Sequence, residues 1–262
     1  MDARVALLAL GLGYCAGPAL AQFDHSHAAW DALLRKNVVV EIHGTASRVR
    51  YMELNRQRLA LREYLDSLSR VTEPEFNAWS KAQRMAFLIN AYNAFTVEKV
   101  LTKYPDIRSI WDFGKLFGDP FKDKFFALLG RPCSLDTIEH DMLRKPGTYD
   151  EPRIHFAVNC ASVGCPMLRE EAYVAERLES QLEAQVRRFF SDHTRNRYNP
   201  RTARLEVSKI FDWFKDDFHP RERFFARYAE FLGQDHGQRQ LILEGRAPLA
   251  FVEYDWSLND SR

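Results

Sequence analysis

Residues 86–101, AFLINAYNAFTVEKVL, carry a strong helical pattern near the middle of the chain. Helix start signals precede it at Thr72–Glu75 and at Ser80, and apolar residues recur at helical spacing along 83–101. We therefore expect a central, mostly buried helix over 83–101. Asn90 and Asn93 fall inside this apolar pattern, so each amide is expected to satisfy a backbone group or to orient another side chain, such as a histidine.

Other elements are expected on both sides of this helix. Upstream, the pattern predicts helices over 23–36 and 55–68, with extended segments at 38–40 and 47–54. Downstream it predicts two short strands within 122–135, a helix over 135–143, a strand over 152–158 and a long helix from Pro166 to about Phe190. A strand at 205–207, helices at 211–218 and 221–232 and a strand at 249–254 follow. These elements indicate an α+β, helix-rich single domain around a small, mainly antiparallel sheet.

The first 21 residues have the pattern of a secretory signal peptide. Arg4 precedes an apolar run that ends in Ala19-Leu20-Ala21, which has the small-x-small form of a cleavage site. A short membrane anchor and a lipid-anchored Cys15 are the alternatives, but the run is shorter than the roughly 20 residues that span a bilayer. We expect residues 22–262 to form the mature domain, without a transmembrane segment, in the periplasm or outside the cell.

The composition restricts the partners. The 262 residues have a net charge of +1, which gives no electrostatic footprint for nucleic acid, and 46% of them are hydrophobic, enough for a large core. No cofactor motif is evident. The expected partner is a small-molecule or peptide substrate, and an exported location also allows an envelope protein partner.

Three cysteines remain in the mature chain: Cys133, Cys160 and Cys165. An odd number in an oxidising compartment predicts one disulfide and one free thiol. Two pairings stay open. Cys160 and Cys165 can bond to each other, or Cys133 can pair with one of them.

Reactive side chains are concentrated between residues 139 and 165, where Glu139, His140, His155, Cys160 and Cys165 occur. Cysteine-dependent catalysis needs a thiolate, a nearby base and often a third group that orients the base. If Pro166 begins a helix, the helix N-terminus lowers the pKa of Cys165. His155 and Cys160 would point to opposite faces of a regular strand, so their pairing requires a turn after Val158.

These residues support three hypotheses. The first is a cysteine-dependent hydrolase or acyl transferase that acts on amide or thioester bonds, with Cys160 or Cys165 as nucleophile and His155 or His140 as base. Glu139 or an asparagine such as Asn90 would orient that base. The second is a non-catalytic envelope binding or scaffold module braced by a disulfide. The third is a metal-dependent hydrolase that uses His140, His155 and one or both thiols, although their spacing matches no standard zinc pattern.

Two later segments have uncertain or structural roles. Residues 211–218 mix aromatic rings with carboxylates, which suits either a ligand-binding wall or an amphipathic helix with a charged outer face, and the helix is favoured. Residues 254–259 are predicted to dock the C-terminal part of the chain onto the core.

Four segments together resemble the domain of unknown function 547 (DUF547) family, found in exported bacterial proteins and in some plant proteins: AFLINAYNAFTVEKVL, SLDTIEHDMLR, RIHFAVNCASVGCPMLR, and the pair SKIFDWFKDDF with VEYDWSLN. The resemblance runs from about Tyr51 to Asn259. The motif positions that it implies are Asn90, Asn93, Glu139, His140, His155, Cys160, Cys165, Pro166 and Arg169.

The predicted order of helix, hairpin and His-bearing strand is also loosely similar to the papain and transglutaminase superfamily. That superfamily places its nucleophilic cysteine on an early central helix, where this chain has Asn90. A catalytic triad in the superfamily's usual chain order is therefore not expected.

Overall fold

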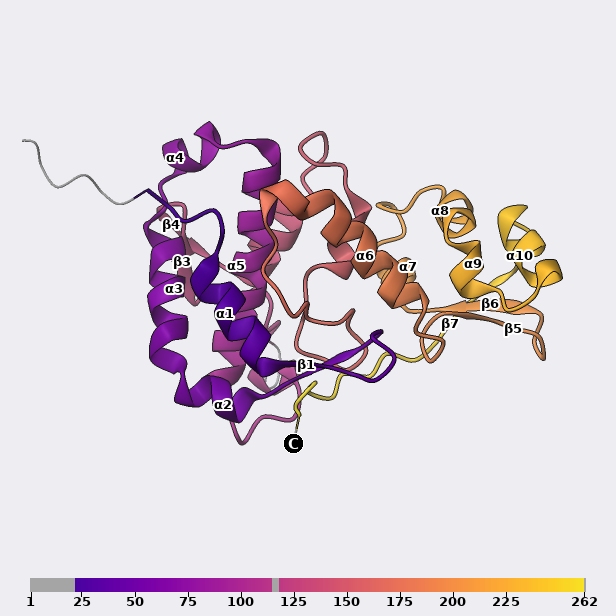
Figure 1. Ribbon diagram of the computed structural model, residues 1–262, viewed down its shortest axis with the longest axis horizontal. Coiled ribbons are helices and arrows are strands. Elements are labelled where there is room, and N and C mark those ends of the chain that lie inside the picture. The colour runs from indigo at the N-terminus through magenta and orange to yellow at the C-terminus, as the bar shows by residue number, and fades with distance from the viewer. Residues whose placement is uncertain (1–21, 115–117, 262) are drawn as a thin grey trace, which may run out of the picture.

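Helix α5, Lys81–Leu101, runs through the larger of two groups of elements in the computed structural model (Figure 1). Ser80 caps the helix through a capping box with Gln83, and every residue from Met85 to Leu101 except Glu98 is buried. The predicted central helix is confirmed. The structure describes residues 22–114 and 118–261, so the predicted signal peptide lies outside the described residues.

Helices make up most of the remaining regular structure. The α-helices besides α5 are α1 (Ala28–Asn37), α2 (Tyr51–Arg56), α3 (Arg58–Arg70), α4 (Glu73–Ala78), α6 (Leu178–Phe190), α7 (Ile210–Trp213), α8 (Arg221–Arg227), α9 (Ala229–Leu232) and α10 (His236–Leu243). Short 3₁₀ helices lie at η1 (Ile110–Phe113), η3 (Pro152–Phe156) and η4 (Ala175–Arg177), and η2 (Thr137–Leu143) is a π-helix.

The strands form three small sheets rather than one. β1 (Val38–Val40) pairs antiparallel with β2 (Ser47–Val49), and β3 (Phe126–Leu128) pairs antiparallel with β4 (Arg131–Cys133). β6 (Arg204–Val207) lies between β5 (Arg197–Asn199), which is antiparallel to it, and β7 (Leu249–Phe251), which is parallel. The predicted α+β, helix-rich fold with mainly antiparallel pairing is confirmed.

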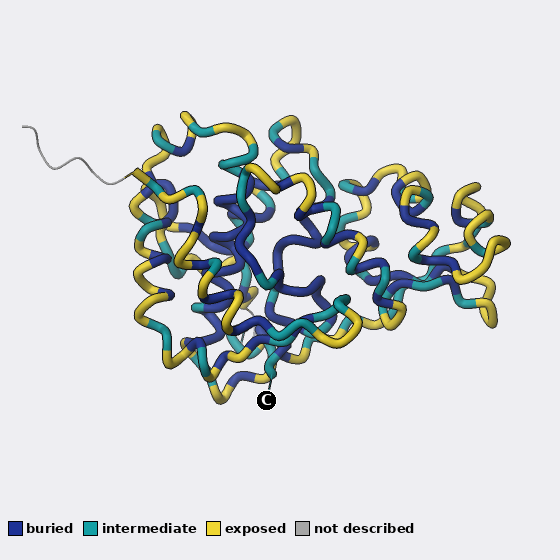
Figure 2. The backbone as a smooth tube through the Cα atoms, in the orientation of Figure 1, coloured by how far each residue is buried: buried dark blue, intermediate teal, exposed yellow. Residues whose placement is uncertain are grey.

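Two hydrophobic cores lie on either side of the middle of the molecule. The first surrounds α5 and includes Leu178 and Leu182 of α6, whereas the second includes Val186 and Phe190 from the other end of α6 and the aromatic residues of α7 to α9. Helix α6 therefore joins two groups of elements, and the buried chain is continuous through this junction (Figures 1 and 2). The larger group holds α1–α5, η2 and the loop at 157–166 that carries Cys160 and Cys165, called the cysteine loop below, and the smaller group holds α7–α10 and β5–β7.

The predicted strand over 152–158 is wrong, because Pro152–Phe156 forms the 3₁₀ helix η3. Pro152 has the backbone angle that suits a helix start, and the Glu151 side chain caps it by accepting the backbone N–H of Arg153. Residues 153–159 are all buried, so the alternation of polar and apolar types did not mark an exposed and a buried face.

The predicted helix from Pro166 is also wrong, because residues 166–174 are irregular and α6 begins only at Leu178. Side chains of other elements satisfy the backbone of this buried segment. Gln185 donates to the carbonyl of Met167, Ser47 to that of Leu168 and Gln181 to that of Ala172. Such partners replace the intrahelical hydrogen bonds that a buried backbone otherwise requires.

Smaller boundary errors occur elsewhere. β2 ends at Val49 and α2 follows, where an extended segment over 47–54 is predicted. α7 ends at Trp213 rather than at residue 218, and β7 ends at Phe251 rather than at residue 254. Within the described residues, none of the helices is long and apolar enough to cross a membrane.

The C-terminal segment packs along the loop that follows η3. The N–H of Val163 donates to Ser257 O at 2.9 Å, the N–H of Gly164 to Asp255 O at 2.8 Å, and the N–H of Asn259 to Ala161 O at 3.0 Å. A Cβ at Gly164 would lie 2.9 Å from the Asp255 nitrogen, so this close approach requires glycine. The predicted docking of the C-terminal segment is confirmed, and it places Tyr254 beside Cys160.

Candidate active site

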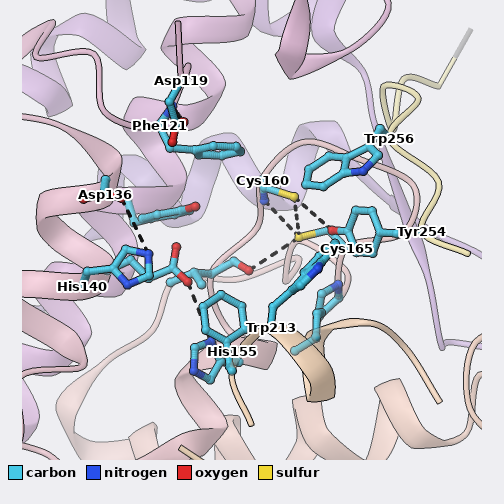
Figure 3. Close-up of a pocket in the computed structure, with 16 residues that line it drawn as sticks. Asp119, Phe121, Asp136, His140, His155, Cys160, Cys165, Trp213, Tyr254 and Trp256 are labelled. Carbon is cyan, nitrogen blue, oxygen red and sulfur yellow. Dashed lines mark hydrogen bonds and ion pairs between the residues drawn. The ribbon is translucent and has the colours of Figure 1, made fainter. Parts of the chain in front are cut away.

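A cavity of about 170 Å³ lies between the two groups of elements (Figure 3). From the larger group it is lined by Tyr92 of α5, by Glu139 and His140 of η2, and by the cysteine loop. The smaller group and the C-terminal segment contribute Ile210, Trp213, Phe214, Tyr254 and Trp256. Such a junction between two cores is a common position for a binding site.

Cys160 and Cys165 lie side by side at this cavity as free thiols. Their Sγ atoms are 3.0 Å apart, well beyond the roughly 2.05 Å of a disulfide bond. Cys133 is also free and is buried away from the cavity lining. The predicted disulfide is therefore wrong for the described cysteines, and the cavity holds a thiol pair instead of a brace.

Cys160 is the more acidic thiol of the pair. Its Sγ lies 2.9 Å from Ser162 Oγ and 3.2 Å from Tyr254 Oη, and both hydroxyls can donate to a thiolate. Burial raises the pKa of Cys160, but the hydrogen bonds from Cys165, Ser162 and Tyr254 outweigh it and lower the pKa to about 7. A large fraction of Cys160 is thus thiolate near neutral pH.

Cys165 has the opposite character. Burial, followed by the neighbouring Cys160, raises its pKa well above the usual value, so it remains a thiol that can donate to Cys160. Because residues 166–174 are irregular, Cys165 has no helix N-terminus beside it, and the predicted cause of a lowered pKa at this position is absent. The acidic cysteine is Cys160, and its acidity comes from hydroxyl and thiol donors.

Glu139 places a second perturbed group at the cavity. It projects from η2, where the N–H of Arg144 bonds to the Glu139 carbonyl at 2.9 Å in a wider turn than the predicted α-helix. Burial, and then the charge of Cys160, raise the pKa of the Glu139 carboxyl to about 7 against the hydrogen bond from Tyr92. A carboxyl with this pKa holds a proton for part of the time at neutral pH and can deliver it.

His155 lies behind Glu139 and is held from the other side. Its Nε2 is 2.7 Å from Asp217 Oδ2, and its ring stacks on Phe214 with centroids 4.0 Å apart. The Asp217 carboxylate only accepts hydrogen bonds, so we assign the ring proton to Nε2. Nδ1 then carries a lone pair 3.7 Å from Glu139 Oε1, without a hydrogen bond among the described residues.

Burial favours the neutral form of this histidine. Burial lowers the pKa of His155, although its hydrogen bond to Asp217 acts in the opposite direction. Asp217 also accepts Arg144 Nη2 at 3.0 Å, and the two partners together overcome its burial and hold its pKa well below the usual range. The side chains of Glu139, His155, Asp217 and Arg144 therefore lie in a row. Hydrogen bonds join the last three, and His155 Nδ1 lies 3.7 Å from Glu139 Oε1.

His140 lies beside Asp136 on one wall of the cavity, across from the sulfur atoms of Cys160 and Cys165 (Figure 3). Its Nε2 is 3.7 Å from Asp136 Oδ1, and its Nδ1 contacts Arg144. Partial burial is the main cause that lowers the pKa of His140. The described residues contain no group of three or more His, Cys, Asp or Glu side chains that could hold a metal ion.

Asn90 and Asn93 form hydrogen bonds with backbone groups, which is one of the two roles expected from the sequence. Asn90 exchanges two hydrogen bonds with Tyr173, at 2.7 and 3.0 Å, and does not line the cavity. Asn93 accepts the N–H of Asn159 at 2.8 Å and donates to Ala157 O at 2.9 Å. Asn93 therefore fixes the chain between His155 and Cys160, whereas Asn90 fixes the segment before α6.

Three contributors to the site are not among the residues predicted from the sequence: Tyr254, Asp217 and Arg144. The mixture of aromatic rings and carboxylates at 211–218 is the signal in the sequence that points to Asp217. The favoured interpretation, an amphipathic helix, places these carboxylates on an outer face. Instead, Trp213 and Phe214 line the cavity and Asp217 binds His155. Tyr254 had only the expected docking of its segment as a signal.

The family model described as "Protein of unknown function, DUF547" matches residues 76–190. This match supports the DUF547 family. The DUF547 segment contains Glu139, His155, Cys160 and Cys165, whereas Asp217 and Tyr254 lie beyond it. No curated protein and no solved structure matches the chain.

Proposed function

We propose that this protein is a cysteine-dependent hydrolase or acyl transferase with Cys160 as the nucleophile. The observation that carries the proposal is the pairing of two groups at one cavity, a thiol whose pKa is lowered to about 7 and the Glu139 carboxyl whose pKa is raised to about 7. Because the two pKa values are close and each charge opposes the other, the two groups together hold about one proton near pH 7, and the reactive form is the one with a Cys160 thiolate and a neutral Glu139 carboxyl.

This state supplies a nucleophile and a general acid together. The Cys160 thiolate attacks the carbonyl carbon of an amide or thioester, forming an S–C bond while the C=O electrons move to oxygen. As the bond to the leaving nitrogen or sulfur breaks, Glu139 gives that atom its proton. The product is a thioester on Cys160 and an ionised Glu139.

The second half returns the site to its starting state. Ionised Glu139 takes a proton from water, or from an acceptor molecule, which attacks the thioester carbon and releases Cys160 as thiolate. Tyr254 Oη and Ser162 Oγ lie within 3.2 Å of Sγ and thus next to the position of the carbonyl oxygen, where their O–H groups stabilise developing charge. His155, held by Asp217, lies with its Nδ1 3.7 Å from Glu139 Oε1.

A chromogenic acyl ester tests this proposal without knowledge of the natural substrate. With p-nitrophenyl acetate in excess, we expect a burst of p-nitrophenolate and an acetyl group located by peptide mapping on Cys160. Cys160→Ala should abolish the burst. Cys133→Ala is the matched control, because Cys133 is a buried free cysteine outside the cavity lining, and it should retain the burst.

The contrary result is an equal acetylation of wild type and Cys160→Ala, which would remove Cys160 from the mechanism. Turnover in water alone identifies a hydrolase, and turnover only with an added amine or thiol identifies a transferase.

Export is a further part of the proposal, and the mass of the mature chain in a periplasmic extract tests it. A chain that begins at Gln22 supports export, and an unprocessed cytoplasmic chain contradicts it.

A further inference from the structure

One side of the cavity is a wall of aromatic rings. Trp213 has its ring centroid 4.9 Å from that of Tyr254 and 5.6 Å from that of Trp256, and Tyr254 and Trp256 are 4.5 Å apart. Trp111 extends the wall at 5.3 Å from Trp256. Trp111 is 42% exposed and Trp213 is 44% exposed, and large aromatic faces left open beside a cavity mark a ligand surface.

The opposite side is acidic. Asp119 and Asp136 face the aromatic wall across the cavity (Figure 3). Among the described lining residues none is lysine or arginine. Among the described residues, Asp119 has an ion pair with Lys122, whose Nζ is 4.0 Å away on a side chain that is 67% exposed. Arg144 is bound to Asp217 instead, so the charged side chains of the described lining give a negative field.

Beyond the two carboxylates, His155 offers a further hydrogen-bond acceptor at the cavity. His155 is 3% exposed and lines the cavity, and its Nδ1 carries a lone pair without a hydrogen-bond partner in the described part of the chain. Asp119 and Asp136 are acceptors as carboxylates. These three acceptors favour a ligand that brings hydrogen-bond donors to this side of the cavity.

We infer that the acyl substrate carries a cationic group, an ammonium or a guanidinium, that binds between the aromatic wall and Asp119 and Asp136. The aromatic faces attract a cation through their π electrons, and the two carboxylates attract it directly. The volume of about 170 Å³ suits the head group of a basic side chain. The inference rests on the proposed function, because Cys160 at the same cavity fixes where the reacting carbonyl lies.

Methanethiosulfonate reagents of different charge test this inference. Each transfers its thioalkyl group to the Cys160 thiolate, forming a mixed disulfide and releasing methanesulfinate. We compare the trimethylammonium-ethyl, sulfonatoethyl and methyl reagents at pH 7 and divide each rate by that of 2-mercaptoethanol. The normalised preference for cation over anion should be about tenfold or more in wild type and should largely disappear in the double variant Asp119→Asn/Asp136→Asn.

Glu63→Gln/Asp66→Asn is the matched control, because it removes the same two negative charges from exposed positions on α3, and the preference should persist there. Fast reaction with the neutral methyl reagent but no preference for the cation would overturn the inference while leaving the proposed function intact. Slow reaction with all three reagents at Cys160 would contradict the proposed function.

A binding measurement that needs no thiol separates these cases further. In Cys160→Ser we titrate butylguanidinium and butyrate and follow tryptophan fluorescence, which reports on Trp213 and Trp256. Butylguanidinium should bind at least about tenfold more tightly than butyrate, and Asp119→Asn/Asp136→Asn should remove this difference. Equal binding of the two compounds would overturn the inference whatever the reactivity of Cys160.

Discussion

Replacing Tyr254 by phenylalanine should raise the pKa of Cys160 without disturbing the fold. The change removes one O–H donor 3.2 Å from Sγ and keeps the ring that packs against Trp213 and Trp256. A hydrogen bond to a charged group contributes about 1.5–3 kcal/mol, and the diffuse charge of sulfur places this one near the lower value. Since about 1.4 kcal/mol corresponds to one pKa unit, the pKa of Cys160 should rise from about 7 to about 8.

The assay is the rate of iodoacetamide alkylation against pH, with peptide mapping to isolate Cys160 and with Cys133→Ala as the common background. The midpoint should move up by about one unit in Tyr254→Phe, while the plateau at high pH stays as high or rises, because a more basic thiolate is the better nucleophile. Tyr198→Phe, at a buried tyrosine of β5, should leave the midpoint unchanged. An unshifted midpoint in Tyr254→Phe would refute the account of how this thiol is made acidic.

Three further changes have defined outcomes. Burial raises the pKa of Glu139 from 4.5 to about 7, so ionising this carboxyl destabilises the folded state increasingly as pH rises through that window. Glu139→Gln should therefore be more stable than wild type by about 3 kcal/mol at pH 8 and nearly equal to it at pH 4. Parallel urea unfolding measures this, and a difference independent of pH would contradict it. The same variant should lose the alkaline limb of the bell-shaped pH profile of acylation by an amide, whose leaving nitrogen needs the Glu139 proton. Rates with an acyl p-nitroanilide against pH record this, and p-nitrophenyl acetate, whose leaving group departs as an anion, is the control. Asn93→Ala removes two buried hydrogen bonds, so it should lower the free energy of unfolding by about 2–4 kcal/mol and also shift the alkylation midpoint of Cys160. Asn90→Ala should lower the free energy of unfolding without shifting that midpoint. A shifted midpoint in Asn90→Ala would show that Asn90 acts on the site. Gly164→Ala should slow alkylation at pH 7 by displacing the segment that carries Tyr254, and Gly237→Ala, whose Cβ meets only Asp235 Oδ1 at 3.4 Å, should not.

Local sequence signals were sufficient where an element depends on its own residues. The apolar pattern and Ser80 cap of α5 predict a buried helix, and the two short strands predicted within 122–135 are β3 and β4, joined by a turn at Leu129-Gly130. Glu139, His155 and Cys160 were also found, because they lie within 22 residues of one another in the sequence.

The failures share a physical cause, which is that distant side chains replace local backbone hydrogen bonds. Residues 166–174 resemble a helix start in sequence, yet Gln181 and Gln185 bind their carbonyls and allow an irregular buried path. Similarly, the acidity of Cys160 depends on Tyr254, and the orientation of His155 depends on Asp217. Contacts over such separations leave no periodic pattern from which they can be predicted.

The packing of the C-terminal segment on the cysteine loop has a consequence for biosynthesis. Tyr254 is added to the chain 94 residues after Cys160, so every shorter nascent chain lacks this donor. Before folding, Cys160 has the ordinary thiol pKa of about 8.5 and is mostly protonated at neutral pH. A chain in transit thus carries a weak nucleophile, and it acquires a reactive one only when synthesis has passed Tyr254 and the segment has folded back onto the loop.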